Sequence, residues 1–426
     1  MKGAAQVYLG SMISSQVCEV RERMSHQAMD TEARELGVLS RREVLWLTGA
    51  GLSLIAVCYG LARFAYGLFV PVFRAEFDLD AATAGAIASG SYAAYCVAII
   101  ISTVLTPRFG GRAVAVTAGV VATAGTLMIA AAPNTIVLAV GVLLAGSSTG
   151  VASPPLAHAV AHTVTATRRN RVQTIINAGT GLGVAIAGPI ALLTHEHWRT
   201  AWLVFSALCA VVTIWAALCV PVASAQDRRT GGIRQVLPRP LLPEGSVRMA
   251  MAAATMGIAS AAVWTFGRDI LVSEGQMSEQ ASTIAWIILG AFGIAGAATG
   301  DLAERFGVAR SWTTIMLTLA AATTLIAVAP GSIPIAWIAA AVFGAAYIGL
   351  TGLLLIWGTH IYADTPAAGV GLAFLIIALG QAGGAPAIGA IAEASSPQSA
   401  FLGAALIAVL GCLIRPRAAE LDSDND

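Results

Sequence analysis

Charge is scarce in this sequence. Of its 426 residues only 11% are Asp, Glu, Lys or Arg, and Lys2 is the only lysine. Soluble domains carry about 25% charged residues. A surface with so little charge would aggregate in water, so the natural solvent of the chain is a lipid bilayer. The net charge of +1 leaves no broad basic surface, which excludes nucleic acid as a partner.

Paired cysteines and a signal peptide are also missing. The six cysteines are spaced without a CxxC pair, and most lie inside apolar runs, where cysteine behaves as a small hydrophobic residue. We therefore expect neither a disulfide framework nor a zinc site, and we expect no metal and no cofactor. Residues 1–43 contain no sustained apolar run, which excludes a cleavable signal peptide and predicts a cytoplasmic N-terminal tail.

Long apolar segments fill the rest of the chain, which is 57% apolar with a mean hydropathy of +0.78. A membrane-spanning helix needs about 20 such residues. The sequence predicts an all-α integral membrane protein with twelve transmembrane helices, near 45–71, 81–105, 113–132, 135–157, 174–194, 200–220, 248–270, 281–300, 311–329, 333–357, 367–391 and 399–414. We predict six-helix bundles at 44–220 and 248–415, a linker at 221–247 and a tail at 416–426.

The distribution of Arg and Lys predicts the orientation. With twelve spans, 20 of the 24 Lys and Arg residues fall on the side of the termini. Three, Arg74, Arg199 and Arg268, fall on the opposite side, and Arg63 lies within a span. Because positive loops stay in the cytoplasm, we expect a multi-pass protein of the plasma membrane with both termini cytoplasmic.

The two predicted bundles share landmarks at a constant spacing. Four residues of the first bundle recur 197 positions later in the second; the pairs are Arg108 and Arg305, Pro133 and Pro330, Gly183 and Gly380, and Pro189 and Pro386. A constant offset indicates a duplicated unit. A unit with an even number of spans repeats in parallel, about an axis along the membrane normal. The sequence therefore predicts two parallel six-helix repeats.

The loop after the eighth predicted span resembles the signature G-x-L-A-D-R-x-G-R of the major facilitator superfamily. The matching residues are Gly300, Glu304 (at the position of the Asp), Arg305 and Gly307, followed by Arg310. The first-half copy keeps Arg108, Gly110 and Arg112, with Pro107 at the acidic position. The resemblance implies that these residues form a gating motif.

Two further segments carry the resemblance, which covers about 44–415. Gly179 followed by Gly188-Pro189 is similar to the start of the antiporter motif, although Leu192 and Leu193 replace the expected glycines. The segment 59–71 resembles the first span of the YbfB/YjiJ-type, cyanate-permease-like branch. The resemblance implies transport of a small-molecule substrate by alternating access, with protons as a candidate coupling ion. We expect a monomer in the lipid bilayer, and no enzyme.

Small residues in the fifth and eleventh spans predict close helix packing combined with bending. We assign this helix-flexing role to Gly179, Gly188, Pro189 and Pro386.

Arg63 is the residue that most needs an explanation. A charge within the bilayer costs at least about 2.5–3.5 kcal/mol and should face a cavity or a partner. Its planar fork matches a carboxylate. We interpret Arg63 as an anchor for an anionic substrate, beside Tyr59 and Tyr66 of the same segment. The alternative is a structural arginine bound to helix carbonyls or reaching the outer surface.

Other residues at membrane depth are weaker candidates. Asn177, Gln381, Trp264 and Trp357 are assigned to substrate binding, with hydrogen bonding or packing between helices as the alternative.

No acidic residue lies in the middle of a span, where it could bind and release a coupled proton, because the acidic residues lie at span ends or outside the spans. The coupling candidates are His158, His360 and Asp269. Asp269 directly follows Arg268, and this pair would form a latch at the outer end or merely a hydrated helix end. Facilitated diffusion stays open.

Several functions compete at this stage. Arg63 favours import of a small organic anion, whereas the Gly179 to Pro189 motif and the aromatic residues favour efflux of amphipathic drugs or toxins. A membrane sensor or receptor would need a ligand or signalling module that no predicted loop is long enough to hold. An intramembrane enzyme would need a motif such as HExxH or paired aspartates, which the spans do not contain.

The predicted orientation can be tested by single-cysteine labelling. In a cysteine-free background, an impermeant thiol reagent added to intact cells should label a cysteine at position 275 but not one at position 230, because the linker is predicted to be cytoplasmic. Labelling of position 230 from outside would contradict the orientation.

Overall fold

The computed structural model describes residues 39–79, 81–194, 197–222 and 240–417, and these residues form helices and connecting turns without a strand. The predicted all-α fold is confirmed. Residues 1–38 of the predicted tail, 223–239 of the linker and 418–426 of the C-terminal tail lie outside the described residues. The elements are α2 (Arg41–Ile55), the π-helix η1 (Ala56–Phe64), α3 (Ala65–Phe77), α4 (Ala81–Phe109), α5 (Gly111–Ala130), α6 (Thr135–Thr163), α7 (Ala166–Leu193), α8 (Trp198–Cys219), α10 (Ser246–Ser273), α11 (Glu279–Gly293), the 3₁₀ turn η3 (Ile294–Ala298), α12 (Thr299–Phe306), α13 (Val308–Val328), α14 (Ile333–Ile361), α15 (Pro366–Ala394) and α16 (Pro397–Gly411).

The helices account for all twelve predicted spans. Eleven described helices are long and apolar enough to cross a membrane, and α16 is a shorter apolar helix. The first span runs without a break through α2, η1 and α3, and the eighth runs through α11, η3 and α12. The chain is therefore a multi-pass helical membrane protein.

Several helices extend beyond the predicted apolar segments. Helix α6 continues to Thr163, α14 continues to Ile361, and α7 already begins at Ala166. A count of apolar residues measures the hydrocarbon core alone, whereas helices continue into the polar interface. As a result His360, predicted just beyond its span, lies within the last turn of α14.

Two glycines turn the chain in the same way in the two halves. Gly110 joins α4 to α5 with φ 84° and ψ 154°, and Gly307 joins α12 to α13 with φ 81° and ψ 150°. A residue with a side chain rarely adopts this positive φ, which explains the glycine of the motif. The two positions are 197 residues apart. Their equal conformation agrees with a duplicated unit, which itself stays a prediction.

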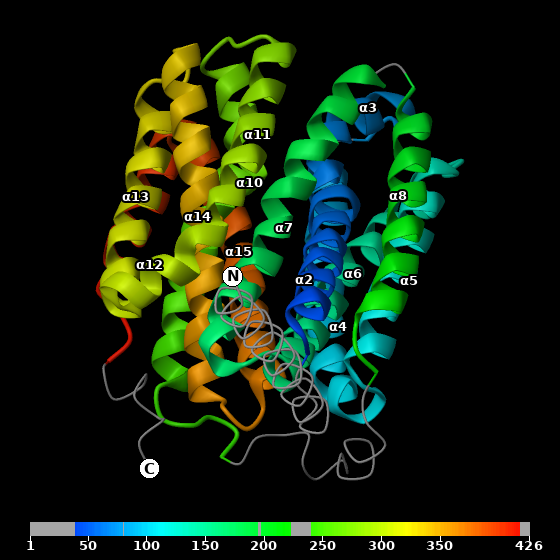
Figure 1. Cartoon of the computed structure of the whole chain (residues 1–426). Helices are drawn as coiled ribbons and strands as arrows, with labels where there is room; N and C mark the ends of the chain where they lie inside the picture. Colours follow the sequence, from blue (N-terminus) through cyan, green and yellow to red (C-terminus); the bar gives the residue numbers. More distant parts are fainter. Residues whose placement is uncertain (1–38, 80, 195–196, 223–239, 418–426) are drawn as a thin grey trace, which may run out of the picture.

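Two groups of helices stand side by side, α2 to α8 on the right of Figure 1 and α10 to α16 on the left. Between the groups, the fifth span (α7) packs against α11 and α14, and the eleventh span (α15) packs against α4 and α6. The two sets of contacts are equivalent: if the first six spans are exchanged with the last six, the contacts of α7 become those of α15. The substrate path of such an arrangement lies between the groups.

Glycines allow the helices to approach closely. A side chain at Gly60 would overlap the backbone of Gly183, and one at Gly179 would overlap the carbonyl of Leu52. Between the two groups, Gly181 lies against the backbone of Gly290. In a bilayer such contacts replace the hydrophobic effect as the force that holds helices together.

The contact between Gly60 and Gly183 makes a stability prediction. Gly60→Val should lower the melting temperature of the detergent-solubilised protein, because the new side chain meets backbone atoms and overpacking costs at least about 1–3 kcal/mol. Gly67→Ala is the matched control, since the space beside Gly67 is open. A Gly60→Val protein as stable as Gly67→Ala would show that the helices do not pack this closely.

Candidate functional site

The first span widens into a π-helix where it carries its charge. The nine residues of η1 include Tyr59 and Arg63, and both side chains line a cavity between the two groups of helices. Stretches of π-helix are rare and occur frequently at functional sites. The apolar pattern of the first span predicted a plain helix and gave no sign of this widening.

The cavity is lined by both groups of helices. Its lining residues are Tyr59, Arg63, Tyr95, Asn177 and Thr180 from the first group and Tyr347, Ile348, Thr351, Phe374, Ile377, Ala378 and Gln381 from the second. The space open to the centre of a water-sized sphere is about 10 Å³, room for about one water molecule. A larger solute can enter only if the two groups separate at one end.

The guanidinium of Arg63 lies among neutral partners. Its Nη2 donates to Oε1 of Gln381 at 3.3 Å. Its central carbon lies 4.6 Å from the ring centre of Tyr92, 4.7 Å from that of Tyr95 and 5.2 Å from that of Phe64. Each such cation–π contact contributes about 0.5–2 kcal/mol. Arg63 therefore points into the protein, and the alternative in which it reaches the outer surface is wrong.

Gln381 is held so that its oxygen faces Arg63. The side chain is 1% exposed, and its Nε2 donates to Ser260 Oγ at 3.3 Å and to the Tyr347 hydroxyl at 3.2 Å. Both partners of the nitrogen belong to the second group of helices, whereas Arg63 belongs to the first. The bond between Arg63 and Gln381 therefore connects the two groups at the cavity.

Asn177 makes a second connection between the groups. Its Nδ2 donates to Thr351 Oγ1 at 2.6 Å and to the carbonyl of Ile348 at 3.1 Å. The Tyr95 hydroxyl donates to the carbonyl of Phe374 at 3.3 Å. Polar side chains at the cavity thus already bond across the interface.

The predicted aromatic residues divide into two sets. Trp264 lies outside the cavity lining but stacks on Phe64 with ring centres 4.2 Å apart, and the Phe64 ring lies 5.2 Å from the central carbon of Arg63. Trp357 is fully buried against Trp312, and Tyr66 packs on Phe73. The structure therefore does not bring Trp357 or Tyr66 to the cavity. Which face of a helix meets the cavity depends on how the helix is rotated in the tertiary structure, and the sequence alone does not specify this rotation.

Tyr347 and Phe374 are cavity residues that the sequence did not single out. The available signal for Tyr347 was a hydroxyl in the middle of an apolar span, where a buried tyrosine needs a hydrogen-bond partner.

The three coupling candidates lie outside the cavity lining. The rings of His158 and His162 are 4.1 Å apart, at the end of α6. His360 Nδ1 lies 2.7 Å from the carbonyl of Ile356, one turn earlier in the same helix. Asp269 is exposed.

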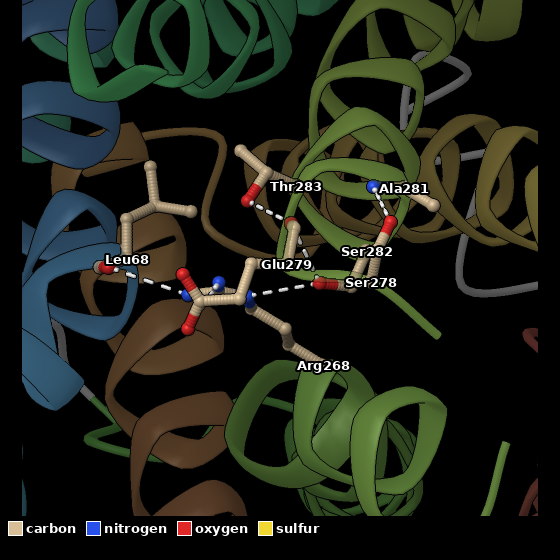
Figure 2. A network of polar contacts seen from close by, with 7 residues as sticks. All are labelled: Leu68, Arg268, Ser278, Glu279, Ala281, Ser282 and Thr283. Carbon is tan, nitrogen blue, oxygen red and sulfur yellow. Dashed lines mark hydrogen bonds and ion pairs between the residues drawn. The ribbon is translucent and has the colours of Figure 1, made fainter. Parts of the chain in front are cut away.

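Arg268 of α10 contacts α3 of the first group and α11 of the second (Figure 2). Its Nε donates to Ser282 Oγ at 3.2 Å and its Nη1 to the carbonyl of Leu68 at 3.4 Å, while Nη2 lies 3.9 Å from Oε1 of Glu279. Arg268 thus contacts α3 and α11, whereas Asp269 is exposed; the latch formed by this pair at the outer end stays a prediction, beside the alternative of a hydrated helix end.

The motif around Gly300 contacts the other group at the opposite end. Arg171 Nε lies 3.7 Å from Oδ1 of Asp301, and Thr174 Oγ1 donates to the carbonyl of Ala297 at 3.2 Å. Arg171 and Asp301 were not among the predicted gating residues. Of those that were, Gly300 lies against the backbone of Arg171.

The other residues predicted to form the gating motif lie outside the cavity lining. Arg108 and Arg305 cover Phe109 and Phe306, the residues that follow them, at 5.5 and 5.2 Å. Glu304 and Arg310 are exposed, and Arg112 Nε donates to the carbonyl of Val220.

The helix-flexing candidates lie in continuous helices. Pro189 is inside α7 and Pro386 is inside α15. Gly188 lies against the side chain of Ile287 in α11.

The contacts of Arg268 make an accessibility prediction. Arg268→Gln removes bonds to a charged donor, which contribute about 1.5–3 kcal/mol, so the end nearest Arg268 should open more often. An impermeant thiol reagent added on that side should label a single cysteine at position 378 at least about tenfold faster. Arg199→Gln is the matched control, because it breaks the pair with Glu76 inside one group. Equal labelling of the two variants would contradict a closing role for Arg268.

Known proteins resemble the chain in sequence and in fold. Over 181 residues it is 29% identical to "Monocarboxylate transporter 13" of Bos taurus and of Rattus norvegicus, a match that spans 42% of this chain and 42% of each relative. The fold is similar to the crystal structure of the human organic anion transporter MFSD10 (TETRAN), with a TM-score of 0.65 and 14% identity over 88% of this chain and 99% of that one. The sequence profile described as Major Facilitator Superfamily matches residues 52–382. The chain therefore belongs to the Major Facilitator Superfamily of transporters, which are not enzymes; the YbfB/YjiJ-type branch stays a prediction.

Proposed function

We propose that this transporter moves a small organic anion by alternating access, with Arg63 as the anchor of the anion. The observation that carries the proposal is the position of the Arg63 guanidinium, which lines the cavity between the groups of helices. Among the described residues its partners are the amide of Gln381 and aromatic rings. The charge is thus available to a ligand.

Electrostatics favours a carboxylate or a similar anion at this place. A guanidinium stays protonated in proteins and presents parallel N–H donors that match two carboxylate oxygens. The attraction is strong in a site that excludes water, since the local dielectric constant is low. A neutral or cationic substrate would leave Arg63 uncompensated.

The rest of the lining suggests a short apolar body attached to the anionic group. Phe374, Ile377 and Ala378 are apolar residues of the cavity lining, beside the hydroxyls and amides that line the same cavity. The small cavity favours a small solute. The names of the similar proteins, a monocarboxylate transporter and an organic anion transporter, agree with this class.

Two sets of contacts at opposite ends support alternating access. Arg268 joins the groups at one end through the carbonyl of Leu68, and Arg171 pairs with Asp301 at the other. Breaking one set at a time would open the cavity to one side while the other stays closed. We place the Arg171 end, the termini and the linker in the cytoplasm of a plasma-membrane protein, in line with the distribution of Arg and Lys.

The proposed transport mechanism contains no proton step. His158, His360 and Asp269 are not cavity residues, so protonation of any of them would have to act on the substrate from a distance.

Efflux of an amphipathic drug is the second candidate. The rings of Tyr59, Tyr95 and Phe374 at the cavity favour it. A bulky apolar compound would gain from these rings but not from the charge of Arg63, and its passage would need a much wider opening of the cavity.

Arg63 provides the test. In vesicles containing the purified protein, uptake of pyruvate, L-lactate or methanesulfonate should be saturable, and Arg63→Gln should abolish it because no other cation lines the described cavity. Arg63→Lys keeps the charge but loses the fork. It should reduce uptake at least about tenfold, since a charged hydrogen bond contributes about 1.5–3 kcal/mol.

Arg199→Gln is the control, because Arg199 lies outside the cavity. An Arg63→Gln protein that carries these anions normally would refute the anchor, and one that transports amphipathic drugs instead would favour the second candidate. An Arg63→Gln protein that fails to accumulate in the membrane would support the structural alternative for this residue.

A further inference from the structure

We infer that this transporter is an obligate anion exchanger, in which the empty carrier does not return across the membrane and each anion that leaves must be replaced by another. The inference rests on the proposed function. Its basis is the juxtaposition of a permanent charge, Arg63, with a cavity whose other described lining groups are neutral.

Three ion pairs of the described residues lie at the ends of the bundle and not at the cavity. They are Arg171 with Asp301, Arg199 with Glu76, and Arg268 with Glu279. Arg63 cannot release its proton in practice. Of the described residues, none supplies a carboxylate to the cavity lining, so a bound anion is what neutralises the site.

Gln381 is a weak substitute for that anion. Its oxygen lies 3.3 Å from Nη2 of Arg63, whereas bonds between a cationic N–H and an anionic oxygen are about 2.7–2.9 Å long. The amide cannot easily move closer, since its nitrogen is held by Ser260 and Tyr347. When the cavity is empty, Gln381 therefore compensates the charge of Arg63 only in part.

Closure of the cavity distinguishes the empty carrier from the loaded one. While one end is open, water solvates the guanidinium. In the closed form the cavity has room for about one water molecule, so most of that solvation is lost. A bound monoanion replaces it and leaves a neutral site, whereas the empty carrier must pass through the closed form with a poorly compensated charge. Exchange is therefore fast and empty return is slow.

Vesicles loaded with labelled pyruvate test the exchange. The purified full chain is reconstituted at neutral pH, with equal potassium on both sides and valinomycin, so that charge left behind by net efflux cannot slow it. Efflux should be at least about tenfold faster with unlabelled potassium pyruvate outside than with the same potassium balanced by a polyanion too large to enter the cavity, a factor equal to about 1.4 kcal/mol in barrier height. Protein-free vesicles give the passive leak.

A substitution at Gln381 tests the cause. Gln381→Glu places a fixed carboxylate beside Arg63, so the empty carrier can close. The stimulation of efflux by outside pyruvate should then fall to within about twofold, equal to about 0.4 kcal/mol, while pyruvate binds less tightly. Ser260→Ala is the matched control, since it alters the support of Gln381 and leaves the cavity lining neutral. It should keep the dependence on outside pyruvate.

The outcomes separate the two proposals. Saturable efflux that is equally fast with and without outside anion would overturn exchange and leave anion transport standing. A folded Gln381→Glu protein, confirmed by its melting temperature, that keeps the full stimulation would overturn the charge argument. If Gln381→Glu does not fold, the wild-type comparison decides alone. Failure to carry pyruvate, L-lactate and methanesulfonate above the leak would overturn the proposed function and with it the exchange.

Discussion

A permanent positive charge at membrane depth constrains the rest of this site. Arg63 cannot be neutralised by losing its proton, and lipid would not solvate it. The protein surrounds it with aromatic rings of η1 and α4 and with the amide of Gln381. These groups stabilise the cation without cancelling it. A site built in this way tolerates its charge in the resting protein and, in the proposed function, keeps it available to an anion.

The same constraint explains why the two groups of helices meet where they do. Arg63 belongs to the first group and Gln381 to the second, so the charge reaches its best protein partner only when the groups are together. Around this point the helices touch through small residues, such as Gly181 against Gly290. Contacts of this kind are dispersive and geometrically strict, and they come apart without exposing large apolar side chains. They suit the opening and closing that the proposed alternating access requires.

The sequence predicted the spans because the bilayer imposes a length and a composition on every helix that crosses it. It also identified Arg63, Asn177 and Gln381, since polar groups at membrane depth are costly and few. Trp264, Trp357 and Tyr66 lie outside the described cavity lining, so their role in substrate binding stays a prediction, and the lining residue Tyr347 was overlooked. An aromatic residue is equally at home against a neighbouring helix or a cavity, so its place depends on helix rotation, which a pattern apolar on all faces does not fix.

By itself, then, the sequence determined that the chain is a helical membrane protein with a charge inside its first span, because transfer free energies act on each residue separately. Tertiary structure decided what surrounds that charge. The widening of η1, the hold of Ser260 and Tyr347 on Gln381, and the contacts of Arg268 with Leu68 and Glu279 join residues far apart in the chain. Such contacts arise from the packing of whole helices, which no local pattern of residues specifies.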